Sequence, residues 1–323
     1  ISDSYNCYAA SSRTPTAANG VASGELPANV TVLNDAASFG LNCAYQTDGT
    51  RALLEVTYDI APGATYAVAS KGGSKTDFAN SIQALLNWGA KVIATDVVSI
   101  NEAMFQDDVI AQLYEQAHAQ GVSVFTLSNN NRDYSWQGAG RDNNANNILE
   151  FDGSANERLM FKPTSSGSYS VLLTWDQPYK SISGQTGNAD LALQIYQTAN
   201  NTLVGSADWN NYTNDPYEWR VSNLTANTDY YISIKKNSGA LPGLVKILFV
   251  NSAGVTFNPA NSAPTIYGSM NSIGAITVGG YAYNNVPYYY VSRGVVPILF
   301  DKAGNRLSAP VVRQKPEIAA TTG

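Results

Sequence analysis

The chain has 323 residues, enough for one large domain or two smaller ones, and only 14% of them are charged. Its net charge is -6, which argues against partners that need a basic surface, namely nucleic acid and an anionic membrane. One histidine in the whole chain excludes a His-rich metal site, and no apolar run is long enough to predict a transmembrane helix.

The first part of the chain alternates amphipathic helices with short apolar strands. In the helix expected over 77–88, Phe78, Ile82 and Leu85 fall on one face, and Gly89 ends the pattern. Strands that alternate with helices predict βαβ units, and therefore a parallel sheet with helices on both faces. The expected helices span 50–58, 77–88 and 107–120, and the expected strands span 66–69, 91–95 and 122–126.

The pattern changes near residue 150. Short strands of alternating polarity, separated by turns rich in Gly, Asn, Asp and Pro, predict a β-sandwich of about 100 residues. A buried strand over 274–280 marks the return of α/β character. We therefore expect an α/β domain formed by 1–150 and 259–323 and interrupted by an inserted sandwich over 151–258. The expected sandwich strands are 168–175, 189–197, 217–221, 230–235 and 244–250.

The two cysteines, Cys7 and Cys43, both stand in polar, loop-like surroundings. We expect them to form one disulfide, which indicates an oxidising compartment and a secreted, extracellular protein. The alternative is a pair of buried free thiols. A zinc site is not expected, because two cysteines without a nearby histidine cannot complete a tetrahedral ligand set.

Seven short motifs are weak one by one, but their order and spacing along the chain are specific. They are ISDS at 1–4, DGT at 48–50, DIAPGA at 59–64, LSNNN at 127–131, ITVG at 276–279, VSRG at 291–294 and KPEIAA at 315–320. In this order they resemble the motifs of the subtilisin-like (subtilase) serine peptidases, which are related to the sedolisins. The resemblance covers about 1–145 and 260–323 and implies a subtilisin-like α/β fold. The inserted segment is similar, more weakly, to the jelly-roll sandwiches that accompany secreted subtilases.

The resemblance implies site roles for three residues. Asp3 takes the place of the triad aspartate, which orients the general base, and Asp48 takes the place of the base itself. Asn130 takes the place of the amide that stabilises the oxyanion, although Asn129 and Asn131 leave this register open by one residue. The alternatives are ordinary cap and turn roles for these polar residues.

Asp48 is the sharpest departure from the family, because subtilases have a histidine there. Sedolisins are similar to this chain in using an acidic residue, and a carboxylate can act as a base when its pKa is raised. The partner acid is Asp3 or Asp96, which follows a predicted strand. The alternative is that Asp48 only caps the helix that begins near Thr50. The single histidine, His118, lies in a predicted helix, and we expect it to be a surface or packing residue.

The nucleophile of the family is not found in the sequence. In subtilases a Gly-Thr-Ser segment follows the KPEIAA-type motif, but no Gly-Thr-Ser triplet occurs here, and Ser292 matches a turn that is structural in the family. Both ends look cut, so we expect the chain to belong to a longer protein and to be inactive alone. We also expect an exposed apolar groove, filled by the missing C-terminal segment or by another polypeptide.

No cofactor is required by these motifs. A calcium ion bound by Asp176 or Asp190 is one interpretation of the turns in the inserted segment, and an ordinary solvated turn is the other.

Two functions are open at this point. The first is a secreted serine endopeptidase that acts on protein or peptide substrates. The second is a catalytically inactive protein of the same fold that binds a peptide or glycan through the cleft or the sandwich. A third interpretation is an unrelated α/β binding protein.

Overall fold

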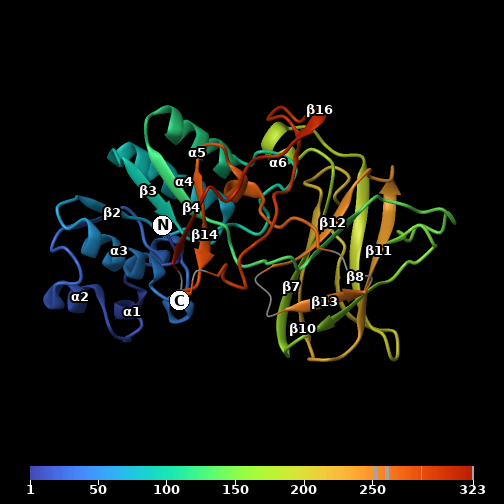
Figure 1. The fold of residues 1–323 in the computed structure, drawn as a ribbon, viewed down its shortest axis with the longest axis horizontal. Helices are drawn as coiled ribbons and strands as arrows, with labels where there is room; N and C mark the ends of the chain where they lie inside the picture. The colour runs from blue at the N-terminus through green and yellow to red at the C-terminus, as the bar shows by residue number, and fades with distance from the viewer. Residues whose placement is uncertain (251–253, 259–261, 285, 322–323) are drawn as a thin grey trace. The chain divides into compact units, whose positions relative to one another are not determined.

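The computed structural model describes residues 1–250, 254–258, 262–284 and 286–321, and its backbone forms two compact units (Figure 1). Unit 1 comprises Ile1–Glu102, Val109–Leu127 and Ser272–Val278. Unit 2 comprises Ala103–Asp108, Ser128–Asn271 and Gly279–Gly323. Within the described ranges, no helix is both long enough and apolar enough to span a bilayer. The chain is a mixed α/β protein with a parallel sheet and separate antiparallel sheets.

Unit 1 is built on parallel strands. β4 (Ser123–Leu127) lies between β3 (Val92–Thr95) and β14 (Ile276–Tyr281) and is parallel to both. A second parallel pair joins β1 (Val30–Val32) to β2 (Tyr66–Val68). The predicted parallel pairing is therefore confirmed. The strand expected at 91–95 is present as β3, but it is only half buried, because Val92 is 62% exposed and only alternate residues are covered.

Two helices cover one face of the β3–β4 pair, α4 (Lys75–Trp88) and α5 (Val109–Ala119) (Figure 1). Phe78 of α4 and Tyr114 of α5 pack with Ile93 and Val124 of the strands in one buried cluster. Each such side chain contributes about 1.5–3 kcal/mol when it leaves water. Both helices were expected from their apolar periodicity, and both are confirmed with bounds shifted by one or two residues.

A second group of helices packs on the side of β2 that faces away from the cluster of α4 and α5. Val68 contacts Leu54 of α3 (Gly49–Ile60) and Leu26, which follows α2 (Ala17–Ser23). The next residue, Ala69, belongs instead to the α4–α5 cluster. Successive side chains of an extended chain point to opposite faces, so helices lie on both sides of β2.

The predicted disulfide is confirmed. Cys7 in α1 (Cys7–Ala10) is bonded to Cys43 at the start of η2 (Cys43–Tyr45), with the two Cα atoms 4.8 Å apart. A further short 3-10 helix, η1 (Ala36–Phe39), lies between the two cysteines in the chain. The bond closes a loop with a sequence separation of 36 residues.

The larger part of unit 2 consists of two antiparallel sheets. One has the strand order β10-β7-β12-β5 and the other β13-β6-β11-β8-β9. The first strand of this sandwich precedes residue 151, and the predicted boundary at residue 259 falls in the stretch 259–261, outside the described residues. The strands are β5 (Ser135–Gly138), β6 (Leu159–Pro163), β7 (Gly167–Trp175), β8 (Ala189–Gln197), β9 (Thr202–Ala207), β10 (Tyr217–Leu224), β11 (Tyr230–Gly239), β12 (Val245–Val250) and β13 (Val255–Asn258).

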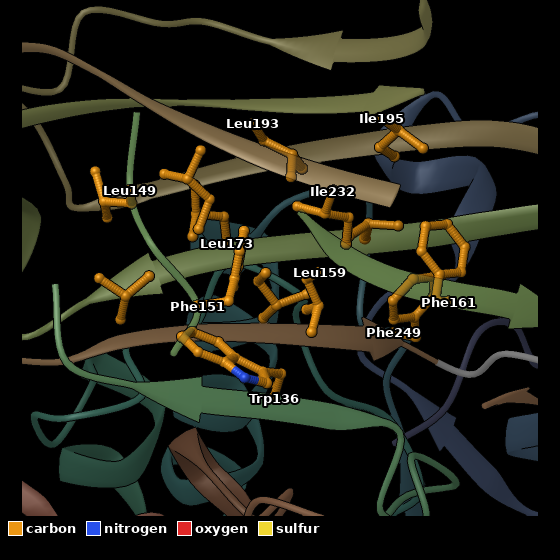
Figure 2. Packing of buried hydrophobic residues seen from close by; sticks show 14 of the residues in the cluster. Trp136, Leu149, Phe151, Leu159, Phe161, Leu173, Leu193, Ile195, Ile232 and Phe249 are labelled. Atoms are coloured by element: carbon orange, nitrogen blue, oxygen red, sulfur yellow. The ribbon is translucent and has the colours of Figure 1, made fainter. Parts of the chain in front are cut away.

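The two sheets enclose one apolar core. Figure 2 shows Leu173, Leu193 and Ile232, from β7, β8 and β11, in the same interior. Trp136 and Phe151 meet there edge to face, with ring centroids 4.9 Å apart. The buried residues recur at every second position of the long strands, which is the period that predicted them.

Several elements are not anticipated by the sequence patterns. β9 is an edge strand paired only with β8, and its two buried residues are Gly205 and Ala207, so it lacks an apolar signal. The strands β5, β6 and β13 are also absent from the expected set. The remaining unanticipated short elements of unit 2 are α6 (Lys180–Ser183), η3 (Gly268–Asn271), the antiparallel pair β15 (Ile298–Phe300) and β16 (Arg306–Val311), and β17 (Ile318–Thr321).

Removing the disulfide should destabilise unit 1. We expect the Cys7→Ser/Cys43→Ser variant to lose about 3–4 kcal/mol of unfolding free energy, because its unfolded chain regains the freedom of the open loop. Urea unfolding of the variant and of the oxidised protein measures the difference. Adding a reductant to the oxidised protein should reproduce the loss, and an unchanged urea midpoint would contradict the expectation.

Lys246 in β12 is a charged residue buried in the sandwich. It is fully buried, its Nζ donates to Ser135 Oγ at 2.6 Å, and desolvation lowers its pKa from 10.5 to about 7. The unfolded chain therefore binds the proton more readily between about pH 7 and 10.5, so stability rises with pH across that window. Lys246→Met should raise the unfolding free energy by about 1–4 kcal/mol at pH 6 and by much less at pH 10. Thermal unfolding at both pH values tests this, and an equal gain at the two would refute it.

Candidate functional site

Asp3 lies in a turn whose backbone is held from both sides. The preceding residue, Ser2, forms a parallel bridge with Ser70, and its carbonyl accepts the N–H of Lys71 at 2.8 Å. The hydroxyl of Ser70 donates to the carbonyl of Asp3 itself. The position of the Asp3 side chain is thus fixed by residues that follow β2.

Each oxygen of the Asp3 carboxylate accepts two hydrogen bonds. Oδ1 accepts the N–H groups of Ser4 and Gly49, each at 2.7 Å. Oδ2 accepts the N–H of Thr47 at 2.5 Å and its hydroxyl at 2.7 Å. Partial burial alone would raise the pKa of Asp3, but these hydrogen bonds outweigh it and hold the pKa below its ordinary value. Asp3 is therefore an anion at neutral pH, placed at the N-terminus of α3.

Gly49 is required for this contact. A Cβ at that position would lie 2.5 Å from Ser2 Oγ and 2.9 Å from Asp3 Oδ1. Glycine alone lets the carboxylate approach the first N–H of the helix. The DGT motif and the ISDS motif are thus brought together by a close backbone approach.

Asp48 is buried beneath the same turn, and its side chain is 0% exposed. Oδ1 accepts the hydroxyl of Ser4 and the N–H of Cys7, each at 2.7 Å. Oδ2 accepts the N–H of Tyr8 at 3.1 Å and lies 3.4 Å from the Arg51 guanidinium. The carboxylate therefore holds the first turn of α1 against the start of α3.

The expectation that Asp48 caps α3 through its side chain is wrong. Asp48 is the N-cap residue by position, but its φ of 55° turns the carboxylate away from the helix, and no side-chain cap bond forms. The free N–H groups of Gly49 and Thr50 are instead accepted by Asp3 Oδ1 and by the carbonyl of Ser4. The cap of α3 comes from the N-terminal turn.

Asp96 follows β3, and its side chain is open to solvent. Its backbone N–H donates to the carbonyl of Ile1 at 3.2 Å. Desolvation by the surrounding protein raises the pKa of Asp96. A hydrogen bond from Ser2 and the positive charge of the Ile1 amino group oppose this rise, and the Asp3 charge adds to it by a smaller amount. The structure thus brings Asp3 and Asp96 into one electrostatic neighbourhood in unit 1.

The Asn129–Asn131 loop follows β4 and belongs to unit 2. The carbonyl of Asn129 accepts the N–H of Ser292 at 3.0 Å, and Ser292 Oγ accepts the N–H of Asn131 at 3.1 Å. Asn129 and Asn131 are buried, whereas Asn130 is exposed and its amide has no partner among the described residues. Asn130 is therefore the member of the three whose amide is free to meet a ligand.

The remaining sequence candidates have surroundings of their own. His118 is exposed in the last turn of α5, as predicted. Asp176 binds the Arg306 guanidinium and the N–H of Leu244, and Asp190 accepts the N–H of Asn211 at 2.9 Å. In the described part of the chain, no three His, Cys, Asp or Glu residues are grouped so that they could hold a metal ion.

An apolar cavity of about 650 Å³ lies in unit 1, bordered by β2, β3 and α3. Leu53, Tyr66 and Trp88 are among its lining residues, and the exposed Val92 is another. The groove expected from the sequence, and the polypeptide that would fill it, stay predictions.

Sequence reasoning missed the small polar residues that hold the acids. Ser4 bonds Asp48, Thr47 bonds Asp3, and Asp35 accepts the N–H groups of Tyr5 and Asn6 at 2.8 and 2.9 Å. For Ser4 the only local signal is the alternation of Ser and Asp at the start of the chain, and Asp35 and Thr47 stand among ordinary turn residues. Such residues are common in turns, so the partners are identified only by the tertiary fold.

Comparison with known proteins gives no family assignment. No family model matches the sequence, and no curated protein matches it. Among solved structures, the Clostridium perfringens CspB protease aligns with 80% of this chain at 10% identity and a TM-score of 0.46. The aligned part is 60% of that protease, so this chain spans about 60% of its length.

Two carbohydrate-binding modules also align with parts of the chain. One is Xyl-CBM35, solved with a glucuronic acid-containing disaccharide, at 16% identity and a TM-score of 0.23 over 40% of this chain and 98% of the module. The other is CBM6cm-2 from Cellvibrio mixtus lichenase 5A, solved with cellotriose, at 14% identity and a TM-score of 0.21 over 36% and 88%. Similarity at this level transfers no activity to this chain.

Asp3→Ala should destabilise unit 1 by about 1–2 kcal/mol at pH 7, because it removes the cap of α3. The pKa of Asp3 is depressed below 3.8 in the folded state, so its contribution is present above that pH and is lost as the pH falls through the folded value. The difference from the wild type should therefore shrink in acid. Urea unfolding at pH 7 and pH 3 measures it, with Asp59→Ala, an exposed residue of the same helix, as the matched control. Equal losses in the two variants would contradict the assignment.

Proposed function

We propose that this chain forms most of the catalytic domain of a secreted subtilisin-like serine endopeptidase. The observation that carries the proposal is the hydrogen bond from the N–H of Gly49 to Asp3, which joins the first two motifs of the family order. A second pair of motifs meets in unit 2, where Asn131 bonds Ser292. Each of these bonds joins two motifs far apart in the chain within its own unit, which supports the family order, and the Cys7–Cys43 disulfide supports secretion.

The proposal gives different roles to the three acids of unit 1. Asp96 is the proton acceptor, because the residue is exposed and desolvation raises the pKa of its carboxyl, which makes it a stronger base than an ordinary aspartate. Asp3 remains ionised beside it and favours the protonated form of Asp96 after proton transfer. Asp48 is a positioning residue, since its carboxylate is buried and accepts hydrogen bonds from Ser4 and Cys7.

Two further parts complete the proposed mechanism. Asn130 donates its free amide to the oxyanion that forms at the scissile carbonyl, which is worth about 3–4 kcal/mol for one such donor. The printed sequence has no Gly-Thr-Ser triplet, so the proposal assigns the serine nucleophile to a part of the protein outside these 323 residues.

The second candidate function is a protein of this fold that binds without hydrolysis. The observation in its favour concerns Asp48, which stands at the position of the family's base. Its buried carboxylate accepts hydrogen bonds from the backbone of α1 and is not exposed to a substrate. In this case the cleft would hold a peptide and no acyl-enzyme would form.

Activity of the full-length secreted protein distinguishes the two candidates. We expect cleavage of a denatured protein substrate and labelling by a serine-directed fluorophosphonate. Asp96→Asn should lower kcat/KM by at least about a hundredfold and remove the acid limb of the pH profile, as loss of a general base does. Asp59→Asn, an exposed acid of the same unit, is the control and should retain activity.

The outcomes separate clearly. Neither labelling nor cleavage by a folded full-length protein would overturn the peptidase proposal and leave the binding scaffold. Labelling with an unchanged pH profile in Asp96→Asn would keep the peptidase but refute the role of Asp96. Circular dichroism of each variant shows whether a loss of activity reflects a loss of fold.

A further inference from the structure

A second cavity, in unit 2, has no role in the proposed peptidase. It is about 520 Å³ in volume and lies between α6 and the segment that leads from β9 into β10. Trp209, Tyr217 and Lys180 are among the residues that line it. Its volume is in the range of about 300–1,000 Å³ that is usual for small-molecule sites.

One wall of the cavity is aromatic and rigid. The Trp209 side chain is 49% exposed and meets the ring of Tyr217 edge on, with centroids 5.8 Å apart. Tyr217 in turn stacks on the buried ring of Tyr179, at 6.3 Å and an interplanar angle of 8°. An indole held in this way and left half in water is a large apolar surface that a ligand could cover.

A buried amide fixes the loop that carries the other side chains. Asn211 is 3% exposed, and its Nδ2 donates to the carbonyls of Asp215 and Tyr217 at 2.7 and 2.5 Å. Its N–H donates to Asp190 Oδ1 at 2.9 Å. Its Oδ1 is buried and has no partner in the described part of the chain, although the residue lines the cavity. The loop is therefore ordered before any ligand binds, with one buried acceptor left unsatisfied.

Four other polar side chains around the indole each have an atom without a hydrogen-bond partner in the described part of the chain. The Ser181 N–H uses one oxygen of Asp215, the Tyr212 N–H uses the amide oxygen of Asn210, and the amide nitrogen of Asn214 donates to a backbone carbonyl. Asp215 Oδ2, Asn210 Nδ2, Asn214 Oδ1 and Lys180 Nζ have no partner among the described residues. They comprise two acceptors and two donors.

We propose that this cavity is a saccharide-binding site in which a pyranose ring stacks on Trp209. A pyranose presents apolar C–H groups on its face and hydroxyls, each both donor and acceptor, around its edge. The exposed indole matches the face, and the mixed donors and acceptors of Asn210, Asn214 and Asp215 match the edge. An entirely apolar ligand would cover these polar groups and leave them without hydrogen-bond partners, which costs binding free energy. The proposal uses unit 2 alone and does not rest on the peptidase function.

Binding of the whole chain to a glycan array, followed by isothermal titration with the glycans retained, tests the site. Trp209→Ala should lower the affinity for each retained glycan by at least about tenfold, the loss expected when one aromatic side chain no longer covers its ligand. Trp219→Ala is the matched control, because Trp219 is 38% exposed in the adjoining strand β10 and its Nε1 donates to Ser170 Oγ outside the cavity. Trp219→Ala should bind as the wild type does.

The result that overturns the proposal is an array on which no glycan is retained, or retained glycans whose affinity is unchanged in Trp209→Ala. Lys180→Gln then distinguishes the kind of saccharide. Weaker binding of hexuronate glycans alone would assign Lys180 to a sugar carboxylate, and equal binding to the variant and the wild type would assign the site to neutral sugars. Both of these outcomes support a pyranose site, and circular dichroism of the variants excludes misfolding as their cause.

Discussion

The order of unit 1 depends on two carboxylates that each serve a helix distant in the chain. Asp3 accepts the first N–H of α3 at Gly49, and Asp48, the residue before Gly49, accepts the N–H groups of Cys7 and Tyr8 in α1. Neither helix end could be buried without such an acceptor, because an unpaired buried N–H costs free energy comparable to a lost hydrogen bond. The Cys7–Cys43 disulfide ties the same region covalently.

This arrangement limits what the acids can do chemically. A carboxylate that is surrounded by donors is stabilised as an anion and is a poor proton acceptor. Asp3 has this character, and its depressed pKa follows from its hydrogen bonds. Asp96, whose carboxyl is desolvated by the surrounding protein, has the opposite shift. The same cluster therefore contains acids of distinct character, which is the usual way in which a site separates a structural acid from a reactive one.

Apolar periodicity was sufficient to predict the main elements, because packing against a single core repeats along a strand or helix. Helices α4 and α5 and strands β7, β8, β11 and β12 were all anticipated on this ground. The edge strand β9 was not, since water covers much of its surface.

The site was predicted less completely than the fold, for a physical reason. The pattern Asp-Gly-Thr indicates a local N-cap, but the positive φ of Asp48 directs its carboxylate toward residues 41 and 40 positions earlier. Side-chain partners at that separation are set by the tertiary fold alone. The aromatic wall formed by Trp209 and Tyr217 was missed for a similar reason, because it depends on Tyr179, which lies in a different part of the chain.

The order of the strands also governs how the chain can assemble. β4 ends at Leu127 and its parallel neighbour β14 begins at Ile276, so the central pairing of unit 1 spans the entire sandwich in sequence. Contacts between residues so far apart form slowly, because a long loop must close before they contribute to stability. During synthesis the sandwich strands leave the ribosome before β14 does, and β4 has an unpaired edge throughout that interval. A folded sandwich shortens the effective loop that β14 must close, which makes early folding of the insertion a condition for efficient completion of the parallel sheet.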